Sequence, residues 1–253
     1  MGAPGRPTPQ PSTTERPRYR DREAEDYRHP DINPFVRSHR TFGPELLPAE
    51  DAWRWRGRWG ERFGREAPLC VEIGSGNGFF LVGTARLHPE WNVLGVEIRY
   101  KRTVLCARKI RAAGLTNALV ARYHAAYLDD LFEDGSLSGM WVNHPDPWPK
   151  ERHEKNRLIS RWFLEDVARL LKPGAFFRLK SDFRDNVDRV EGLLDHGPEG
   201  EPLPRLPLRI TGRSDDVNGQ GAPWPDDVVT NYQRKMLLRG QPVYAIELVR
   251  DPA

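Results

Sequence analysis

Two acidic residues flank a glycine-rich run, and together they form the first pattern in this sequence that could bind a ligand. Residues 71–78 read VEIGSGNG, where a predicted strand turns into a predicted helix. Glycines at such a turn let the backbone approach a ligand that any Cβ would block, although a purely structural turn is the alternative. Glu72 stands just before the glycines, and Glu97 ends the next predicted strand, where a carboxylate can accept hydrogen bonds from both hydroxyls of a ribose. Phe79 occupies the third glycine position of the dinucleotide fingerprint G-x-G-x-x-G, which disfavours NAD or FAD.

An aspartate between prolines is the second candidate for chemistry. Residues 143–150 read NHPDPWPK and follow a predicted central strand. In an open α/β sheet the carboxyl end of such a strand faces the ligand crevice, so we expect Asp146 to point at the reacting groups. The prolines restrict the backbone and leave the carboxylate little conformational entropy to lose. A rigid surface loop is the alternative, and it explains the prolines better than it explains the aspartate.

Cations and stackable rings follow directly after this aspartate. The mixture suits RNA phosphate together with an extruded base, and its place beside the expected active site favours this interpretation over a solvated helix start. RNA binding should then depend steeply on salt. The residues concerned are Trp148, Lys150, Arg152, His153, Lys155 and Arg157.

These segments need a scaffold, and alternating strands and helices supply one from Pro68 onward. Short apolar runs alternate with helical patterns, which is typical of βαβ units around a mostly parallel sheet with helices on both faces. Two late strands, separated by a long loop, predict an added antiparallel hairpin. The predicted strands are 69–73, 92–98, 118–123, 139–143, 175–180, 206–211 and 243–249, and the predicted helices are 79–87, 101–113 and 157–171.

The flanking and connecting segments differ from this pattern. Residues 1–40 are rich in Pro and Arg and poor in aliphatic residues, so we expect a disordered tail before a single catalytic domain over residues 41–253. Trp55, Trp59 and Phe63 recur at four-residue spacing, which predicts a short amphipathic helix leading into the core. The loop 212–229 is long and rich in Asp, Gly and Pro, and ordering over a substrate or a mere insertion explains it equally well.

Composition limits the class of protein and its location. Lys and Arg number 39 against 36 Asp and Glu, a net charge of +3 that is compatible with a polyanionic partner without requiring one. Cys70 and Cys106 lack metal-ligand spacing, so we expect reduced packing residues and no metal. The sequence shows neither an apolar run of about eighteen residues nor a signal-peptide pattern, which predicts a cytoplasmic protein off the membrane. No obligate protein partner is evident, and both monomer and homodimer stay open.

The segment from residue 145 to 157 resembles the PDPWPK(x)RHxKxR signature of the tRNA (guanine-N7-)-methyltransferases, a family of class I methyltransferases that depend on S-adenosylmethionine (SAM). The resemblance extends over roughly residues 35–249 and includes LKPG at 171–174, KSD at 180–182 and TNYQR at 230–234. It implies a Rossmann-like α/β fold with a mostly parallel seven-stranded sheet and an antiparallel C-terminal hairpin. It also implies SAM as the methyl donor and tRNA as the substrate, methylated at guanine N7 in the variable loop.

The resemblance assigns roles to individual residues. Glu72 is expected to hold the ammonium of the methionine moiety, and Asp146 takes the catalytic position. His124 stands where the family usually has an aspartate near the adenine, and Tyr232 with Gln233 replaces the Phe and Glu of a T-x-F-E motif, which bears on affinity and turnover. The predicted SAM contacts are Glu72, Gly74, Gly76, Glu97, His124 and Asp146, and the predicted tRNA contacts are Lys150, Asp182, Thr230, Asn231, Tyr232 and Gln233.

Guanine N7 carries an in-plane lone pair and no proton, so its attack on a sulfonium methyl needs positioning more than a strong base. An aspartate at the site can stabilise the charge that develops on the purine. Three other interpretations stay open. They are a SAM methyltransferase acting on another nucleobase or a small molecule, a non-catalytic RNA-binding relative weakened through His124 and Gln233, and, more remotely, a NAD-dependent dehydrogenase.

Overall fold

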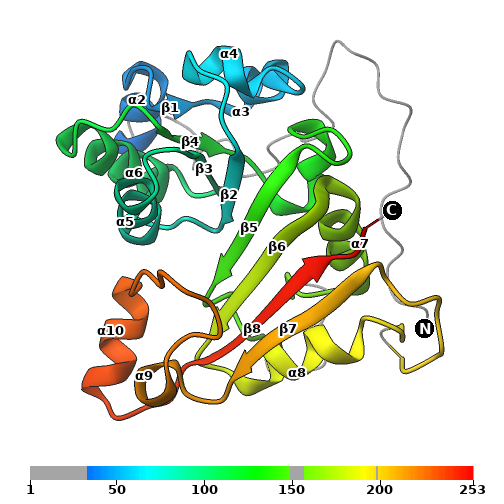
Figure 1. Ribbon diagram of the computed structural model, residues 1–253. Coiled ribbons are helices and arrows are strands. Elements are labelled where there is room, and N and C mark those ends of the chain that lie inside the picture. The colour runs from blue at the N-terminus through cyan, green and yellow to red at the C-terminus, as the bar shows by residue number, and fades with distance from the viewer. Residues whose placement is uncertain (1–32, 149–156, 198, 253) are drawn as a thin grey trace.

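The computed structural model describes residues 33–148, 157–197 and 199–252, which fold around one mixed β-sheet (Figure 1). Within these residues the sheet has eight strands in the order β1-β4-β3-β2-β5-β6-β8-β7. The six strands from β1 to β6 run parallel, and β8 is antiparallel to both of its neighbours. This confirms the predicted Rossmann-like class with its antiparallel C-terminal pair. The strands are β1 (Leu46–Leu47), β2 (Leu69–Ile73), β3 (Asn92–Glu97), β4 (Ala118–Arg122), β5 (Leu137–Asn143), β6 (Leu171–Ser181), β7 (Leu208–Ser214) and β8 (Tyr244–Arg250).

The sheet has one strand more than the seven that were predicted. The additional strand β1 extends the edge at β4, with Leu46 opposite Val120. A strand of two residues contains no full period of alternation, so its sequence carries no recognisable strand signal. The other differences are shifts of the ends, the largest being at β6, which begins at residue 171 and not at 175.

Helices cover both faces of the sheet, which explains why β2, β3 and β4 are buried along their whole length. One face packs on η2 (Ala125–Asp130), α7 (Arg161–Leu170) and α8 (Arg184–Gly192). The opposite face packs on α5 (Phe79–Leu87) and α6 (Tyr100–Ala112). Cys70 and Cys106 are buried free thiols, and burial raises the pKa of Cys70 to about 12, so both serve packing.

Helix α7 is shorter than the predicted 157–171. The Ser160 hydroxyl caps it by accepting from the Phe163 amide at 3.2 Å, so residues 157–159 precede the helix. The helix then ends at Leu170 and the chain passes directly into β6. The predicted stop at Pro173 and Gly174 therefore lies inside β6, three residues beyond the helix end.

The segment before the sheet is more ordered than predicted. Helix α2 (Pro34–Thr41) lies largely inside the range 1–40 that we expected to be a tail. Val36 on this helix is fully buried, and the partly buried Phe35 packs against the core cluster that contains residues of α5 and α6. Burial of these two side chains offsets the ordering of the helix, so the tail prediction is wrong for residues 34–40. Residues 1–32 lie outside the described residues.

The predicted tryptophan helix is interrupted. After α3 (Ala49–Ala52), the short helices η1 (Trp53–Trp55) and α4 (Trp59–Phe63) are separated at Gly57, whose φ is 75°. Only glycine adopts such an angle readily, which explains the break. Trp59 is nonetheless buried, as expected for core packing, and its indole N–H donates to the Leu131 carbonyl at 2.9 Å.

Two further helices lie between β7 and β8. They are α9 (Val217–Gln220) and α10 (Asn231–Leu238). Figure 1 shows them, in orange, at the end of the sheet where the β5 arrowhead points. The motif at 230–234 therefore lies at the edge where the parallel strands end, although it follows those strands by many residues in the sequence.

Candidate active site

The glycine run forms the turn between β2 and α5, as predicted. Gly74 and Gly76 have φ values of 75° and 54°, in the left-handed region that glycine favours. A Cβ built at Gly74 would meet no atom within 4 Å, so free space lies above the turn. The loop therefore offers its backbone to a ligand at the carboxyl end of β2.

Glu97 lies directly against this loop. Its Oε2 accepts from the Gly76 amide at 3.1 Å, and its Oε1 accepts from the Arg99 amide at 2.9 Å. The side chain is only 5% exposed. The two bonds hold the carboxylate at the end of β3 beside the glycine turn, the place where the sequence predicts a ribose to bind.

Glu72 is the most perturbed acid of the site. It is 2% exposed, and its Oε1 accepts from the Asn143 amide group at 3.0 Å, whereas its Oε2 has no hydrogen-bond partner among the described residues. Burial raises the pKa of Glu72 to about 8. A buried carboxyl oxygen without a donor fits a cationic group of a ligand. Asn143, which holds the other oxygen, was not singled out by the sequence analysis, because only pairing of β2 with β5 shows its role.

Asp146 follows β5 at the predicted strand end and is exposed. The loop around it is fixed at several points: the His144 amide donates to the Lys180 carbonyl at 2.7 Å, and Asn186 donates to the Pro145 carbonyl at 3.3 Å. The Asp146 charge acts on the hydroxyl of Tyr232, one of several influences that raise the pKa of that tyrosine, of which burial is the largest. Lys150 lies outside the described residues.

The C-terminal motif meets this loop. Thr230 caps α10 by accepting from the Gln233 amide at 2.8 Å, and the same hydroxyl lies 3.0 Å from Nε2 of His144. The Tyr232 hydroxyl donates to Asp182 at the end of β6 at 3.3 Å. The structure thus brings together three of the predicted tRNA contacts, and Asn231 begins the same helix.

Gln233 takes a different position. It is 3% exposed, and its Oε1 accepts from the buried Lys180 ammonium at 2.9 Å. The Asp227 carboxylate accepts from the same ammonium at 2.8 Å, and the Val228 carbonyl accepts at 2.8 Å. Lys180 is fully buried, and burial lowers its pKa. Gln233 and Asp227 therefore bind a buried cation beneath the site. Tyr232 of the motif at 230–234 is 43% exposed and faces outward.

His124 lies two residues beyond the end of β4, next to the end of β3, where the Tyr123 amide donates to the Glu97 carbonyl. Its Nδ1 accepts from the Ala126 amide at 3.0 Å and so caps η2. Burial lowers the pKa of this imidazole, which favours the neutral ring. The role of His124 at the edge of a donor site stays a prediction.

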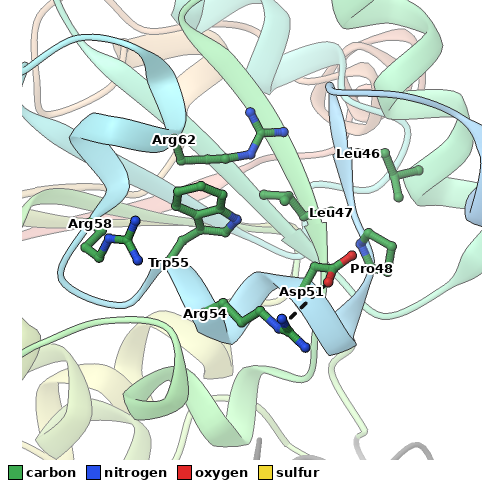
Figure 2. A pocket seen from close by; sticks show the side chains of 8 residues that line it. All are labelled: Leu46, Leu47, Pro48, Asp51, Arg54, Trp55, Arg58 and Arg62. Carbon is green, nitrogen blue, oxygen red and sulfur yellow. Dashed lines mark ion pairs between the residues drawn. The ribbon is translucent and has the colours of Figure 1, made fainter. Parts of the chain in front are cut away.

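A hollow of about 500 Å³ lies elsewhere, beside β1 (Figure 2). None of the predicted site residues lines it. Its arginines already have protein acceptors: Arg58 donates to Glu61, Arg62 donates to the Pro44 carbonyl, and Arg54 lies 3.9 Å from Asp51. The residues that line it are Leu46, Leu47, Pro48, Asp51, Arg54, Trp55, Arg58 and Arg62.

The described parts of the chain contain neither a metal cluster nor a membrane-spanning helix. No three His, Cys, Asp or Glu side chains there are placed to share a metal ion. No helix among these residues is long and apolar enough to cross a membrane.

Solved structures share this fold. The 16S rRNA methyltransferase KamB matches with a TM-score of 0.57 at 16% identity, over 78% of this chain and 94% of that one. An antibiotic-related methyltransferase matches with a TM-score of 0.53 at 16% identity, over 76% of this chain and 94% of that one. The chain therefore shares the Rossmann-like fold of these methyltransferases.

Sequence comparison narrows the class. A family model described as a putative methyltransferase matches residues 66–246. The tRNA (guanine-N(7)-)-methyltransferase of Limosilactobacillus fermentum is 33% identical over 85% of this chain and 93% of its own length, and that of Geobacillus kaustophilus is 36% identical over 78% and 86%. The chain belongs to the tRNA (guanine-N7-)-methyltransferase family, which confirms the resemblance carried by the PDPWPK segment.

Proposed function

We propose that this protein transfers the methyl group of SAM to N7 of a guanine in tRNA, within the variable loop. Family membership supports the reaction and the class of substrate. The single structural observation that carries the proposal is the convergence of two halves at one sheet edge. Buried acids and the glycine turn form one half, and the Asp146 loop with the Asp182, Thr230 and Tyr232 cluster forms the other.

The first half fits SAM. The unpartnered Oε2 of Glu72 suits the ammonium of the methionine moiety, and Glu97 suits the ribose hydroxyls. The open space above Gly74 leaves room for the donor, and His124 lies at the edge where the adenine would be held. When bound, SAM supplies an electrophilic methyl group on a sulfonium sulfur.

The second half fits a purine. Guanine presents N1–H and N2–H donors on its Watson–Crick edge, and the Asp182 carboxylate, 28% exposed, can accept from both. The exposed Tyr232 ring offers a stacking surface. We expect Lys150 and the other basic residues of the run 150–157 to pair with phosphates of the tRNA backbone.

Catalysis in this arrangement rests on positioning and charge. Guanine N7 attacks with its lone pair and no proton has to be removed, so no general base is needed. The purine becomes cationic as the bond forms, and Asp146 and Asp182 place negative charge beside it. Asp146 is the residue that we assign to the catalytic position.

Incubation with labelled SAM and unmodified tRNA tests the function. Chemical cleavage at 7-methylguanine should map the label to the variable loop, and label at another base or no label would contradict the proposal. Asp146→Asn should retain SAM binding and lower kcat by about 10- to 100-fold, the effect of one charged contact. Full turnover in this variant would remove Asp146 from catalysis.

A further inference from the structure

His144 belongs to none of the predicted contacts, yet it touches three of them. Its backbone leaves β5 with a φ of 50°, which is uncommon for any residue but glycine and frequent at functional sites. The side chain is 6% exposed. The turned backbone directs the ring inward, between the end of β6 and the start of α10.

The contacts of the ring favour one tautomer, although Nδ1 forms no hydrogen bond among the described residues. Nε2 lies 3.0 Å from the Thr230 hydroxyl, and Nδ1 lies 3.5 Å from Oδ1 of Asp182. The Thr230 oxygen already accepts from the Gln233 amide, so its own proton is free to be donated to Nε2. The remaining ring proton then belongs on Nδ1, where it faces Asp182. The 3.5 Å separation is long for a hydrogen bond, as such contacts often are before substrate binds.

Asp182 is held from two sides. His144 faces Oδ1, and the Tyr232 hydroxyl donates to Oδ2 at 3.3 Å. The contact with His144 is the largest influence that lowers the pKa of Asp182, so the carboxylate is ionised. The Asp182 side chain is 28% exposed, which leaves it accessible to the guanine edge that the proposed function places here.

The reaction makes this contact stronger as it proceeds. A bond forms between N7 and the methyl carbon, the carbon–sulfur bond breaks, and its electron pair leaves with the sulfur as a neutral thioether. The purine keeps the positive charge, which makes N1–H and N2–H better donors to a carboxylate. An interaction that is stronger in the transition state than in the ground state raises kcat.

We propose that His144 is a positioning residue that holds the Asp182 carboxylate oriented toward the Watson–Crick edge of the target guanine. This inference rests on the proposed function and adds a residue to it. His144 acts through Asp182 and not by touching substrate.

The proposal makes the reaction sensitive to acid. A protonated His144 would place a cation beside Asp182 and cancel the charge that supports the purine. Burial lowers the pKa of His144, Asp182 raises it, and the Lys180 ammonium lowers it. Tyr232 also faces the ring, with a centroid distance of 4.8 Å, and is itself under the influence of Arg239 and Asp146. The rate should therefore fall on the acid side of pH 6.5, the ordinary value.

Two substitutions at residue 144 test the role of the ring N–H donor while they keep the backbone turn. Glycine and asparagine both accept a positive φ, so both should fold. His144→Gly removes the donor and should lower kcat about 10- to 100-fold with SAM affinity unchanged. His144→Asn keeps an N–H toward Asp182 and should stay within about fivefold of the wild type, a fraction of one hydrogen bond. His196→Asn is the control, because His196 is exposed and also neighbours an aspartate, Asp195, at 2.6 Å.

The pH profile distinguishes positioning from packing. At saturating SAM and tRNA, the wild type should lose activity as the pH falls from 6.5 to 5, whereas the activity of His144→Asn should not change over this interval. In the protein without ligands, an NMR titration of the His144 ring should give a lower pKa in Asp182→Asn than in the wild type, because a carboxylate stabilises the protonated ring.

Three outcomes would overturn the inference. They are wild-type kcat in His144→Gly, an acid-side loss of activity in His144→Asn equal to that of the wild type, and a His144 titration that Asp182→Asn does not move. If the wild type fails to methylate tRNA, the proposed function fails on that result alone. The NMR titration still decides whether His144 and Asp182 are coupled.

Discussion

Glu72 shows how one residue prepares a binding site before its ligand arrives. The fold takes a carboxyl group out of water and gives a donor to only one of its oxygens, Oε1, which accepts from Asn143. Such burial disfavours the charged form, so the Glu72 carboxyl is mostly protonated at pH 7 in the ligand-free protein. A ligand ammonium would restore the lost stabilisation of the carboxylate. Affinity and stability should therefore respond to this residue in opposite directions.

Glu72→Gln should strengthen the fold and weaken donor binding. The folded pKa is raised to about 8 from the ordinary 4.5, so the wild-type carboxyl lowers stability progressively as pH rises between these values. A neutral amide has no such cost. At pH 8 we expect the Tm of the ligand-free variant to rise by at least about 2–4 °C, which corresponds to about 1 kcal/mol in a domain of this size. We expect its SAM affinity to fall about 10- to 100-fold. A lower Tm at pH 8 would contradict the assignment.

SAM affinity of the wild type should increase with pH. Glu72 must release its proton to pair with an ammonium. The SAM dissociation constant, measured by calorimetry, should therefore decrease by up to about tenfold as the pH rises from 6 to 7. The gain should stop near pH 8, where an α-amino group itself loses its proton. Glu72→Gln serves as the control, with a much flatter profile over the same interval. An equal slope in both proteins would mean that another group titrates.

At the level of single residues, candidate site residues could be predicted where a neighbouring turn or strand end in the sequence marks them. Glu72 and Glu97 were predicted because each stands next to a glycine turn or at a strand end. His144 and Asn143 were missed, since their partners lie 86 and 71 residues away in sequence. Only the pairing of strands and the return of the C-terminal helix bring such partners together.

Among the elements, the connection between α9 and α10 is anchored to the sheet by one cation. Lys180 on β6 binds the Asp227 carboxylate, the Val228 carbonyl and the Gln233 amide oxygen. Val228 also packs over α5, where a Cβ added at Gly83 would lie 2.6 Å from its side chain. The part of the predicted loop that contains Asp227 and Val228 is therefore packed against β6 and α5, and its ordering over a substrate stays a prediction.

Asp227→Asn should be strongly destabilising. It leaves a buried ammonium without a carboxylate, a change that typically costs about 3–5 kcal/mol. Asp227→Asn combined with Gln233→Glu should recover much of the loss, because the Gln233 oxygen already lies 2.9 Å from the same nitrogen. Denaturant titration measures both, with exposed Asp226→Asn as the matched control. Failure of the double variant to recover any stability would show that the site accepts the charge only at position 227.

Most elements could be predicted from sequence because their patterns are strong. Strands buried on both faces give apolar runs, as in β2 and β3, and the turn residues after them mark their ends. Most of the misses were short or interrupted elements, and the helices α9 and α10 lie where only a long loop between the two late strands was predicted. β1 is too short for a pattern, Gly57 divides the tryptophan helix, and α2 was hidden in a polar, Pro-rich segment.

The whole molecule carries a net charge of only +3, so its affinity for RNA must come from local clusters and not from a general attraction. The replacement of Lys150 and Arg152 by alanine should weaken tRNA binding and reduce the slope of log K against log salt by about 2. Arg205→Ala with Arg209→Ala removes the same charge elsewhere and should leave the slope unchanged. An equal loss in both pairs would indicate a diffuse field. Filter binding at several salt concentrations measures this.

The position of β8 has a consequence for how the protein is made. This strand, residues 244–250, lies between β6 and β7 in the interior of the sheet. Until the ribosome has released it, β6 exposes a bare edge of backbone amides and carbonyls, the kind of edge that invites wrong pairing. The nascent chain therefore depends on β8 to close the sheet, and chaperones that shield open strand edges should matter most between the synthesis of β6 and that of β8.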